Sequence, residues 1–118
     1  MKVMIRLNIL FLFLIFSLLF YSTNAKSSLP GKDLFYNSKG KFGSCNHCHS
    51  IDGTNRRWNS ETQSIEPEEG RKIPSLKGVG KRKDKDQIER SIQMMRKMFD
   101  FKLTDEQISQ LVEYLGTL

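Results

Sequence analysis

The hydrophobic positions of this 118-residue chain form one dense block near the start and two sparse stripes near the end. The block runs from Leu7 to Tyr21 and follows two basic residues. Small residues then appear in Thr23-Asn24-Ala25, where a signal peptidase would cut. This pattern predicts a signal peptide over residues 1–25 and a mature domain over residues 26–118.

An uncleaved membrane anchor is the alternative for the first block. Val3 to Tyr21 spans 19 residues, and at ~1.5 Å per residue this length is close to the ~30 Å of a hydrocarbon core. In both cases the remaining chain lies outside the cytoplasm, on the oxidising side. We therefore expect a periplasmic or other extracytoplasmic protein, either released or anchored to the inner membrane.

Two amphipathic helices are predicted in the last third of the chain. The first is capped by Asp84 or Asp86 and continues with a stripe of apolar residues at helical spacing: Ile88, Ile92 and Met95. The second begins with Thr104 and Gln107, which form a capping box, and it ends near Gly116. Its apolar face consists of Ile108, Leu111, Val112 and Leu115.

The rest of the mature chain has less regular patterning. Pro30 suits the first turn of a short helix over Gly31–Tyr36. Residues 52–72 are polar apart from Trp58 and Ile65, and this segment is predicted to be a loop. No stretch alternates as a strand would for more than a few residues. The predicted class is therefore all-α, with three to four helices and long loops.

Charge and size limit what the domain can do. After removal of residues 1–25, 93 residues remain, and 17 basic against 13 acidic residues give a net charge of +4. This charge is too small to argue for nucleic-acid binding. A domain of this size buries only ~60–65% of its unfolded surface, and one disulfide between nearby cysteines adds little stability. The composition therefore favours a bound cofactor that completes the core.

The chemistry is concentrated in one string, Cys45-Asn46-His47-Cys48-His49. Two thiols on one helical turn can reach the two vinyl groups at one edge of a haem, and His49 then presents its imidazole to the iron. The string predicts one covalently bound haem c, attached through Cys45 and Cys48 with His49 as an axial iron ligand. A thioredoxin-like redox pair, a zinc site and a plain disulfide are the alternatives, and His47 is expected to be a solvated spacer.

The second axial ligand is less well defined by the sequence. The soft candidates are three methionines, Met94, Met95 and Met98. Met95 shares the apolar stripe of its helix, which also suits ordinary core packing. Met98 lies at the expected helix end, where the chain can bend over the haem, and we expect it to be the ligand. Met95, Met94 and an open iron position stay as alternatives.

These features together resemble the small monohaem class I c-type cytochromes that bacteria export. The resemblance covers most of the mature domain. It rests on six stretches: Gly31 with Phe35, the CNHCH string, Ile73–Leu76, Gly78–Arg82, Met98–Ile108 and Leu111–Leu115. One departure is Phe99, which stands where the family usually has proline after the ligand methionine.

The resemblance implies a class I cytochrome c fold wrapped around the haem. It implies that the Pro74 carbonyl holds His49 and that Arg82 reaches a haem propionate. Leu76 and Phe101 are implied as further residues of the haem pocket. The first helix is expected to cross the last one closely, with Tyr114 stacking toward Phe35.

The resemblance also implies a one-electron carrier that exchanges electrons with redox partner proteins. Enzyme activity is not expected, because no acid/base pair accompanies the haem and only His47 is free. Residues 77–102 hold nine basic and four acidic residues, which indicates a partner with an acidic docking surface. Nucleic acid is not expected as a partner, and a membrane is expected only if the N-terminal segment stays uncleaved. Two further functions stay open: a haem with an open or displaceable ligand that binds CO or NO, and an electron-transfer subunit of a larger oxidoreductase.

Overall fold

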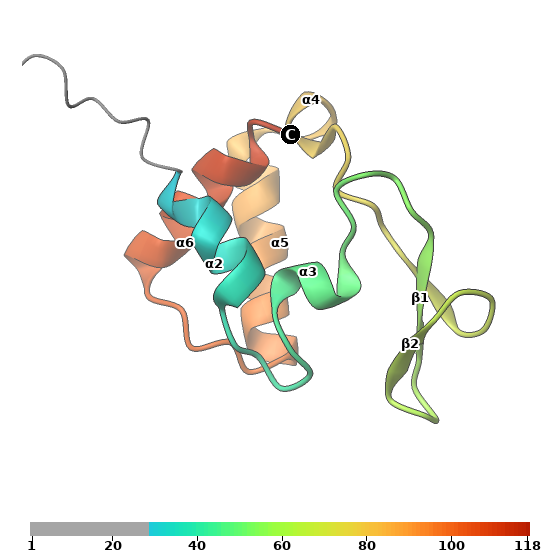
Figure 1. Cartoon of the computed structure of the whole chain (residues 1–118). Coiled ribbons are helices and arrows are strands. Elements are labelled where there is room, and N and C mark those ends of the chain that lie inside the picture. Colours follow the sequence, from blue (N-terminus) through green and yellow to red (C-terminus); the bar gives the residue numbers. More distant parts are fainter. Residues whose placement is uncertain (1–28) are drawn as a thin grey trace, which may run out of the picture.

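The computed structural model describes residues 29–118, which form five helices and one three-stranded sheet (Figure 1). The predicted signal peptide, residues 1–25, lies outside the described residues. The helices are α2 (Pro30–Asn37), α3 (Cys45–Cys48), α4 (Val79–Arg82), α5 (Lys85–Met98) and α6 (Asp105–Leu115). The strands are β1 (Arg56–Asn59), β2 (Ser64–Glu66) and β3 (Arg71–Ile73). Within residues 29–118, no helix is long and apolar enough to cross a membrane.

Capping boxes fix where the two long helices begin. The Asp84 side chain accepts a hydrogen bond from the Gln87 backbone N–H at 2.8 Å, and the Gln87 side chain accepts one from the Asp84 N–H at 3.0 Å. Asp84, and not Asp86, is therefore the cap of α5. Thr104 and Gln107 make the same reciprocal pair at the start of α6, as the sequence predicts.

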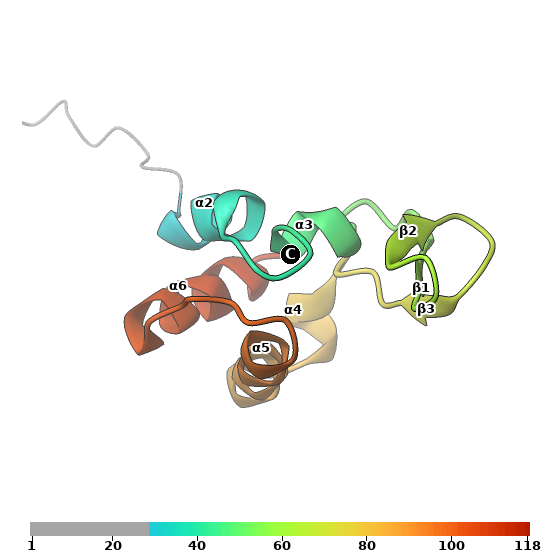
Figure 2. The same cartoon turned by 90° about the horizontal axis from the view of Figure 1, so that it is seen from below.

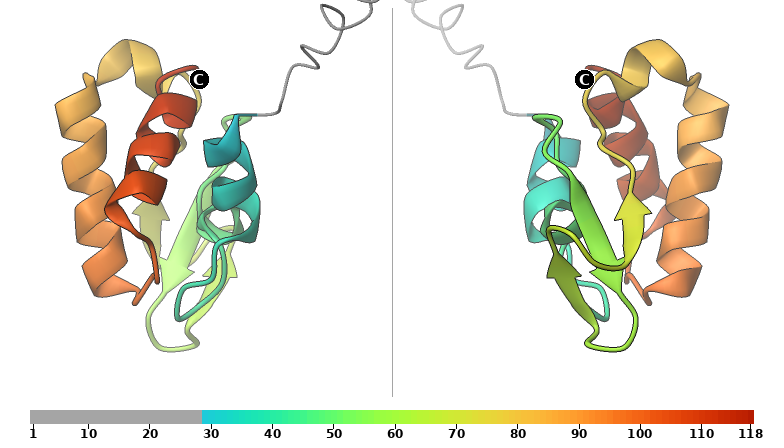
Figure 3. Two further views of the ribbon diagram at one scale, coloured as in Figure 1. Left: turned by 90° about the vertical axis from the view of Figure 1, so that its left-hand side faces the viewer. Right: turned by 90° about the vertical axis from the view of Figure 1, so that its right-hand side faces the viewer.

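The apolar core lies between α2, α5 and α6, and α6 is the central helix of the three (Figures 2 and 3). Three side chains, Phe35, Ile108 and Leu111, are almost completely buried. The α5 stripe contributes Ile88 and Ile92 to the same core. Helix α6 therefore presents apolar residues to two neighbours, which explains why its buried face is the widest.

The crossing of α2 over α6 depends on a glycine. A Cβ atom on Gly31 would lie 2.0 Å from the backbone oxygen of Gln110, so only glycine allows this approach. One turn later the rings of Phe35 and Tyr114 lie 5.8 Å apart between centroids. The close crossing and the Phe35–Tyr114 contact are both those implied by the family resemblance.

The all-α prediction is wrong for the segment between α3 and α4. Residues 56–73 form an antiparallel sheet with strand order β2-β1-β3, in which Trp58 pairs with Ile65 on one side and with Arg71 on the other. Strands of three or four residues are too short for alternation to be recognised, and turns set their pairing instead. Asn59 accepts hydrogen bonds from two following N–H groups, and Gly70 has a φ of +97° where it passes the Trp58 carbonyl.

The sheet lies beside α3, away from the α2–α6 crossing (Figure 1). Trp58 packs its ring on Phe42, with centroids 4.8 Å apart, and Phe42 in turn lies 6.2 Å from Phe99. These three rings join the sheet, the loop before α3 and the residue after α5. The predicted loop is therefore ordered, and Phe42 is the contact that holds Trp58.

We expect Gly31→Ala to lower the free energy of unfolding by about 1–3 kcal/mol, because the added methyl group overpacks the crossing. This loss should exceed the gain in helix propensity of at most ~1 kcal/mol. Denaturant unfolding of the intact protein measures the change. Lys32→Ala, at an exposed neighbour on the same helix, is the control, and equal unfolding free energies for the two variants would contradict the close crossing.

Candidate functional site

The two cysteines flank the single turn of α3, and their side chains are half-buried thiols that are not joined by a disulfide. Burial raises the pKa of the Cys45 thiol, and a hydrogen bond with the Ser38 hydroxyl at 3.5 Å offsets part of that rise. Burial likewise raises the pKa of the Cys48 thiol, with Arg56 acting in the opposite direction. Both groups therefore stay protonated at neutral pH, which limits unassisted oxidation to a disulfide.

His49 follows directly and is held in one orientation. Its Nδ1 atom lies 2.9 Å from the carbonyl oxygen of Pro74. Because a carbonyl only accepts, Nδ1 carries the proton and Nε2 keeps its lone pair. Burial lowers the pKa of the His49 imidazole, while the hydrogen bond to Pro74 acts in the opposite direction. The ring is therefore neutral at neutral pH, which is the form that binds a metal.

A network of hydrogen bonds fixes the turn that contains Pro74. Leu76 donates its N–H to the Ser50 carbonyl at 2.8 Å, and the buried Ser50 hydroxyl donates to the Thr54 carbonyl at 2.8 Å. Leu76 is half-buried and packs against the apolar core. The acceptor of the His49 proton is therefore attached to the core on one side and to the segment after α3 on the other.

Arg82 lies in the same part of the molecule. Its guanidinium donates to the backbone carbonyls of Lys77 and of Ser75, the latter at 3.1 Å. The side chain therefore stabilises the turn after Pro74 in the described residues, and its role toward a propionate stays a prediction.

The methionines differ in their surroundings. Met95 is half-buried against the helices, whereas Met94 and Met98 are 51% and 59% exposed. Met98 is the last residue of α5, and the segment after it is attached to the loop before α3, because Lys41 donates its N–H to the Phe99 carbonyl at 2.6 Å. The Phe101 ring lies against Gly40, where a Cβ atom would be 2.7 Å from it. Met98 and Phe101 are thus connected to the approach to Cys45.

These residues fit a covalently attached haem. Two thiols share one turn, a neutral imidazole with an available Nε2 follows them, and an exposed thioether ends α5. Within residues 29–118, no group of three or more His, Cys, Asp or Glu side chains could hold a metal ion, so a zinc site gains no support. The described sheet is antiparallel and lacks the βαβ unit of a thioredoxin-like pair.

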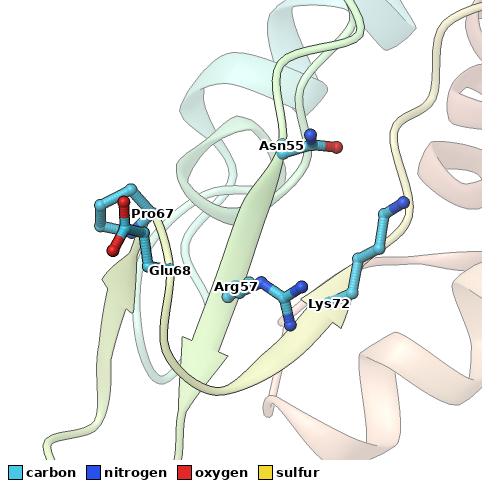
Figure 4. A pocket seen from close by; sticks show the side chains of 5 residues that line it. All are labelled: Asn55, Arg57, Pro67, Glu68 and Lys72. Atoms are coloured by element: carbon cyan, nitrogen blue, oxygen red, sulfur yellow. The ribbon is translucent and has the colours of Figure 1, made fainter.

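Among the hollows of the described surface are a larger one on the sheet and a smaller one beside His49. The larger one is lined by five residues on the sheet: Asn55, Arg57, Pro67, Glu68 and Lys72 (Figure 4). It contains none of the predicted site residues. The smaller one borders His49 and Arg56, beside Phe35 and Asp52. Of the two, only the smaller hollow borders a predicted site residue, His49.

Sequence reasoning did not single out Arg56. Its guanidinium donates to the carbonyls of Asn46 at 2.5 Å and of His47 at 3.2 Å, within the CNHCH string. The available signal was the spacing of Arg56 and Trp58, since residues two apart share one face of a strand. That signal has meaning only once residues 56–59 are known to be a strand.

Comparison with known families is consistent with this geometry. The family model described as Cytochrome c matches residues 28–118, which include every helix and strand described above. Searches of curated proteins and of solved structures returned no match. The chain therefore belongs to the cytochrome c family, whose members bind haem c covalently and generally carry electrons.

Proposed function

We propose that this protein is an extracytoplasmic one-electron carrier with a single haem c, attached through Cys45 and Cys48 and ligated by His49 and Met98. The observation that carries the proposal is the neutral His49 ring, fixed by Pro74 at 2.9 Å and placed directly after the two thiols. The haem, when bound, supplies an Fe(II)/Fe(III) couple. The predicted signal peptide over residues 1–25 is the basis for the proposed location.

The protein residues around this couple have distinct tasks. Cys45 and Cys48 make the attachment permanent, so the domain keeps the cofactor that completes its core. His49 offers Nε2 in a fixed direction, which keeps the ligand geometry similar in both oxidation states. The thioether of Met98 is a soft ligand that favours the reduced iron and so raises the potential.

Met98 is preferred over the other methionines because of its place at the end of α5. Phe99, which stands where the family usually has proline, donates its N–H to the Met95 carbonyl at 3.0 Å. Proline has no N–H and could not make this bond. Asp100 then has a φ of +53°, so the chain no longer follows the axis of α5. The substitution therefore supports a helix that continues to Met98 itself.

The basic docking surface is proposed at α4 and the start of α5, and it consists of Lys77, Lys81, Arg82, Lys83 and Lys85, all exposed. Lys85 is paired with Glu113 at 2.5 Å, and Arg82 is bonded to backbone carbonyls. The remaining lysines are available to an acidic redox partner. Charged surfaces of this kind act mainly on the rate of encounter.

Replacing both cysteines, Cys45→Ser with Cys48→Ser, should leave a chain that loses all haem on denaturation, because no thioether can form. Denaturing gel electrophoresis with haem staining measures the loss. His47→Ala is the control, since this residue is exposed on the same turn and should keep full staining. Haem that stays attached in the double variant would refute attachment at these thiols.

Met98→Ala should keep the haem attached, abolish the far-red iron–sulfur absorption band and allow the reduced protein to bind CO. Met94→Ala and Met95→Ala should each keep the band and exclude CO. Absorption spectra of the oxidised, reduced and CO-treated proteins distinguish the three variants. Loss of the band in Met94→Ala or Met95→Ala alone would move the ligand to that residue, and CO binding by the unsubstituted protein would favour gas binding instead.

Charge reversal at Lys81 and Lys83 should slow electron exchange with a carboxylate-coated electrode severalfold at low salt and weaken its dependence on salt concentration. Lys32→Glu with Lys39→Glu is the control with the same charge change, because both residues are exposed but lie outside the basic surface. Electrode kinetics at several salt concentrations measure the effect. Equal slowing by the control would show that only net charge matters.

A further inference from the structure

We propose that Arg56 is a positioning residue that raises the reduction potential of the haem by holding the CNHC turn and by fixing a positive charge beside His49. This inference rests on the proposed function, because it concerns the potential of the haem that His49 would ligate. Three observations carry it: two backbone hydrogen bonds, the register of the sheet, and the charge near the site.

The hydrogen bonds satisfy carbonyls that the helix cannot satisfy itself. Helix α3 has only four residues, and the last carbonyls of any helix have no partner within it. Arg56 donates from one guanidinium nitrogen to the carbonyls of Asn46 at 2.5 Å and His47 at 3.2 Å. A basic side chain at a helix C-terminus is also favoured by the helix dipole. Arg56 therefore fixes the turn on which Cys48 and His49 sit.

The sheet register places the backbone of Arg56 against the other half of the site. Arg56 pairs with Ile73, which directly precedes Pro74, the acceptor of the His49 proton. The side chain of Arg56 thus holds the turn that carries the ligand, while its backbone faces the strand that leads to the ligand's acceptor. Arg56 therefore links the CNHC turn to the end of β3.

Arg56 and its neighbour Arg57 lie on opposite faces of β1. Arg56 and Trp58 share one face of β1, and both contact the part of the chain around α3. Arg57 points to the opposite face, lines the polar hollow on the sheet (Figure 4) and donates to the Gly70 carbonyl at 3.0 Å. Arg57 is therefore a matched control, with the same charge one residue away.

The charge of Arg56 reaches the ligand and one attachment thiol. It lowers the pKa of both Cys48 and His49, in each case as a smaller effect than burial. A fixed positive charge disfavours Fe(III) relative to Fe(II), because the oxidised site carries one more positive charge. The nearby Asp52 carboxylate opposes this effect, and its pKa is lowered chiefly by hydrogen bonds from Thr54. Asp52 is exposed, so solvent screens it more than it screens the half-buried Arg56.

The test compares reduction potentials of holoproteins that carry Arg56→Gln, Arg56→Lys and Arg57→Gln. We expect Arg56→Gln to shift the Fe(II)/Fe(III) equilibrium toward the oxidised form by about threefold to tenfold, which corresponds to a fall of about 30–60 mV for one electron. Arg56→Lys keeps the charge and should recover most of the potential. Arg57→Gln should leave it unchanged.

Equal potentials for Arg56→Gln and Arg57→Gln would overturn the inference. If Arg56→Gln yields no holoprotein, Asp52→Asn tests the same balance of charges near His49. Removal of this opposing carboxylate should raise the reduction potential. An unchanged potential would refute the inference. A native protein without covalent haem would refute the proposed function before any potential is measured. Covalent haem with potentials insensitive to Arg56 would refute the inference alone.

Discussion

The hydrogen bond between His49 Nδ1 and the Pro74 carbonyl joins two segments that lie 25 residues apart in the chain. It decides which nitrogen of the ring carries the proton and therefore which one is available to a metal. The residues between His49 and Pro74 must therefore fold so that these two residues meet again. The antiparallel sheet does so, because its central strand β1 leaves α3 and its last strand β3 leads into Pro74.

Helices α2, α5 and α6 also support this contact. Helix α6 packs against α2 and α5, and α2 leads into the loop that precedes Cys45. Helix α5 ends at Met98, and the next residue accepts a hydrogen bond from Lys41 at 2.6 Å. The two segments proposed to carry the iron ligands, the CNHCH string and the end of α5, are thus attached to a packed helical core. The ring of Phe42 contacts Trp58 of the sheet and Phe99 after α5, so it connects the sheet to the end of α5. The site therefore depends on contacts between the loop before Cys45 and the segment after Met98.

The parts of this architecture that the sequence predicts are those encoded within a few residues. The capping box of Thr104 and Gln107, the Gly31 crossing position and the CNHCH string each depend on local chemistry or on a spacing shared by a family. The sheet could not be foreseen, because its strands are short and its pairing depends on residues such as Trp58 and Ile65 meeting across a turn. Arg56 was missed for the same reason, since its partners Asn46 and His47 become neighbours only when β1 has formed.

Covalent attachment of one haem to Cys45 and Cys48 is tested by the intact mass of the denatured protein, recorded together with its reduced and oxidised absorption spectra. We expect a chain that starts near Lys26 and is heavier than its sequence by one haem, with the narrow bands of a low-spin c-type haem on reduction. A mass equal to that of the bare chain, with Cys45 and Cys48 as thiols or as a disulfide, would contradict it.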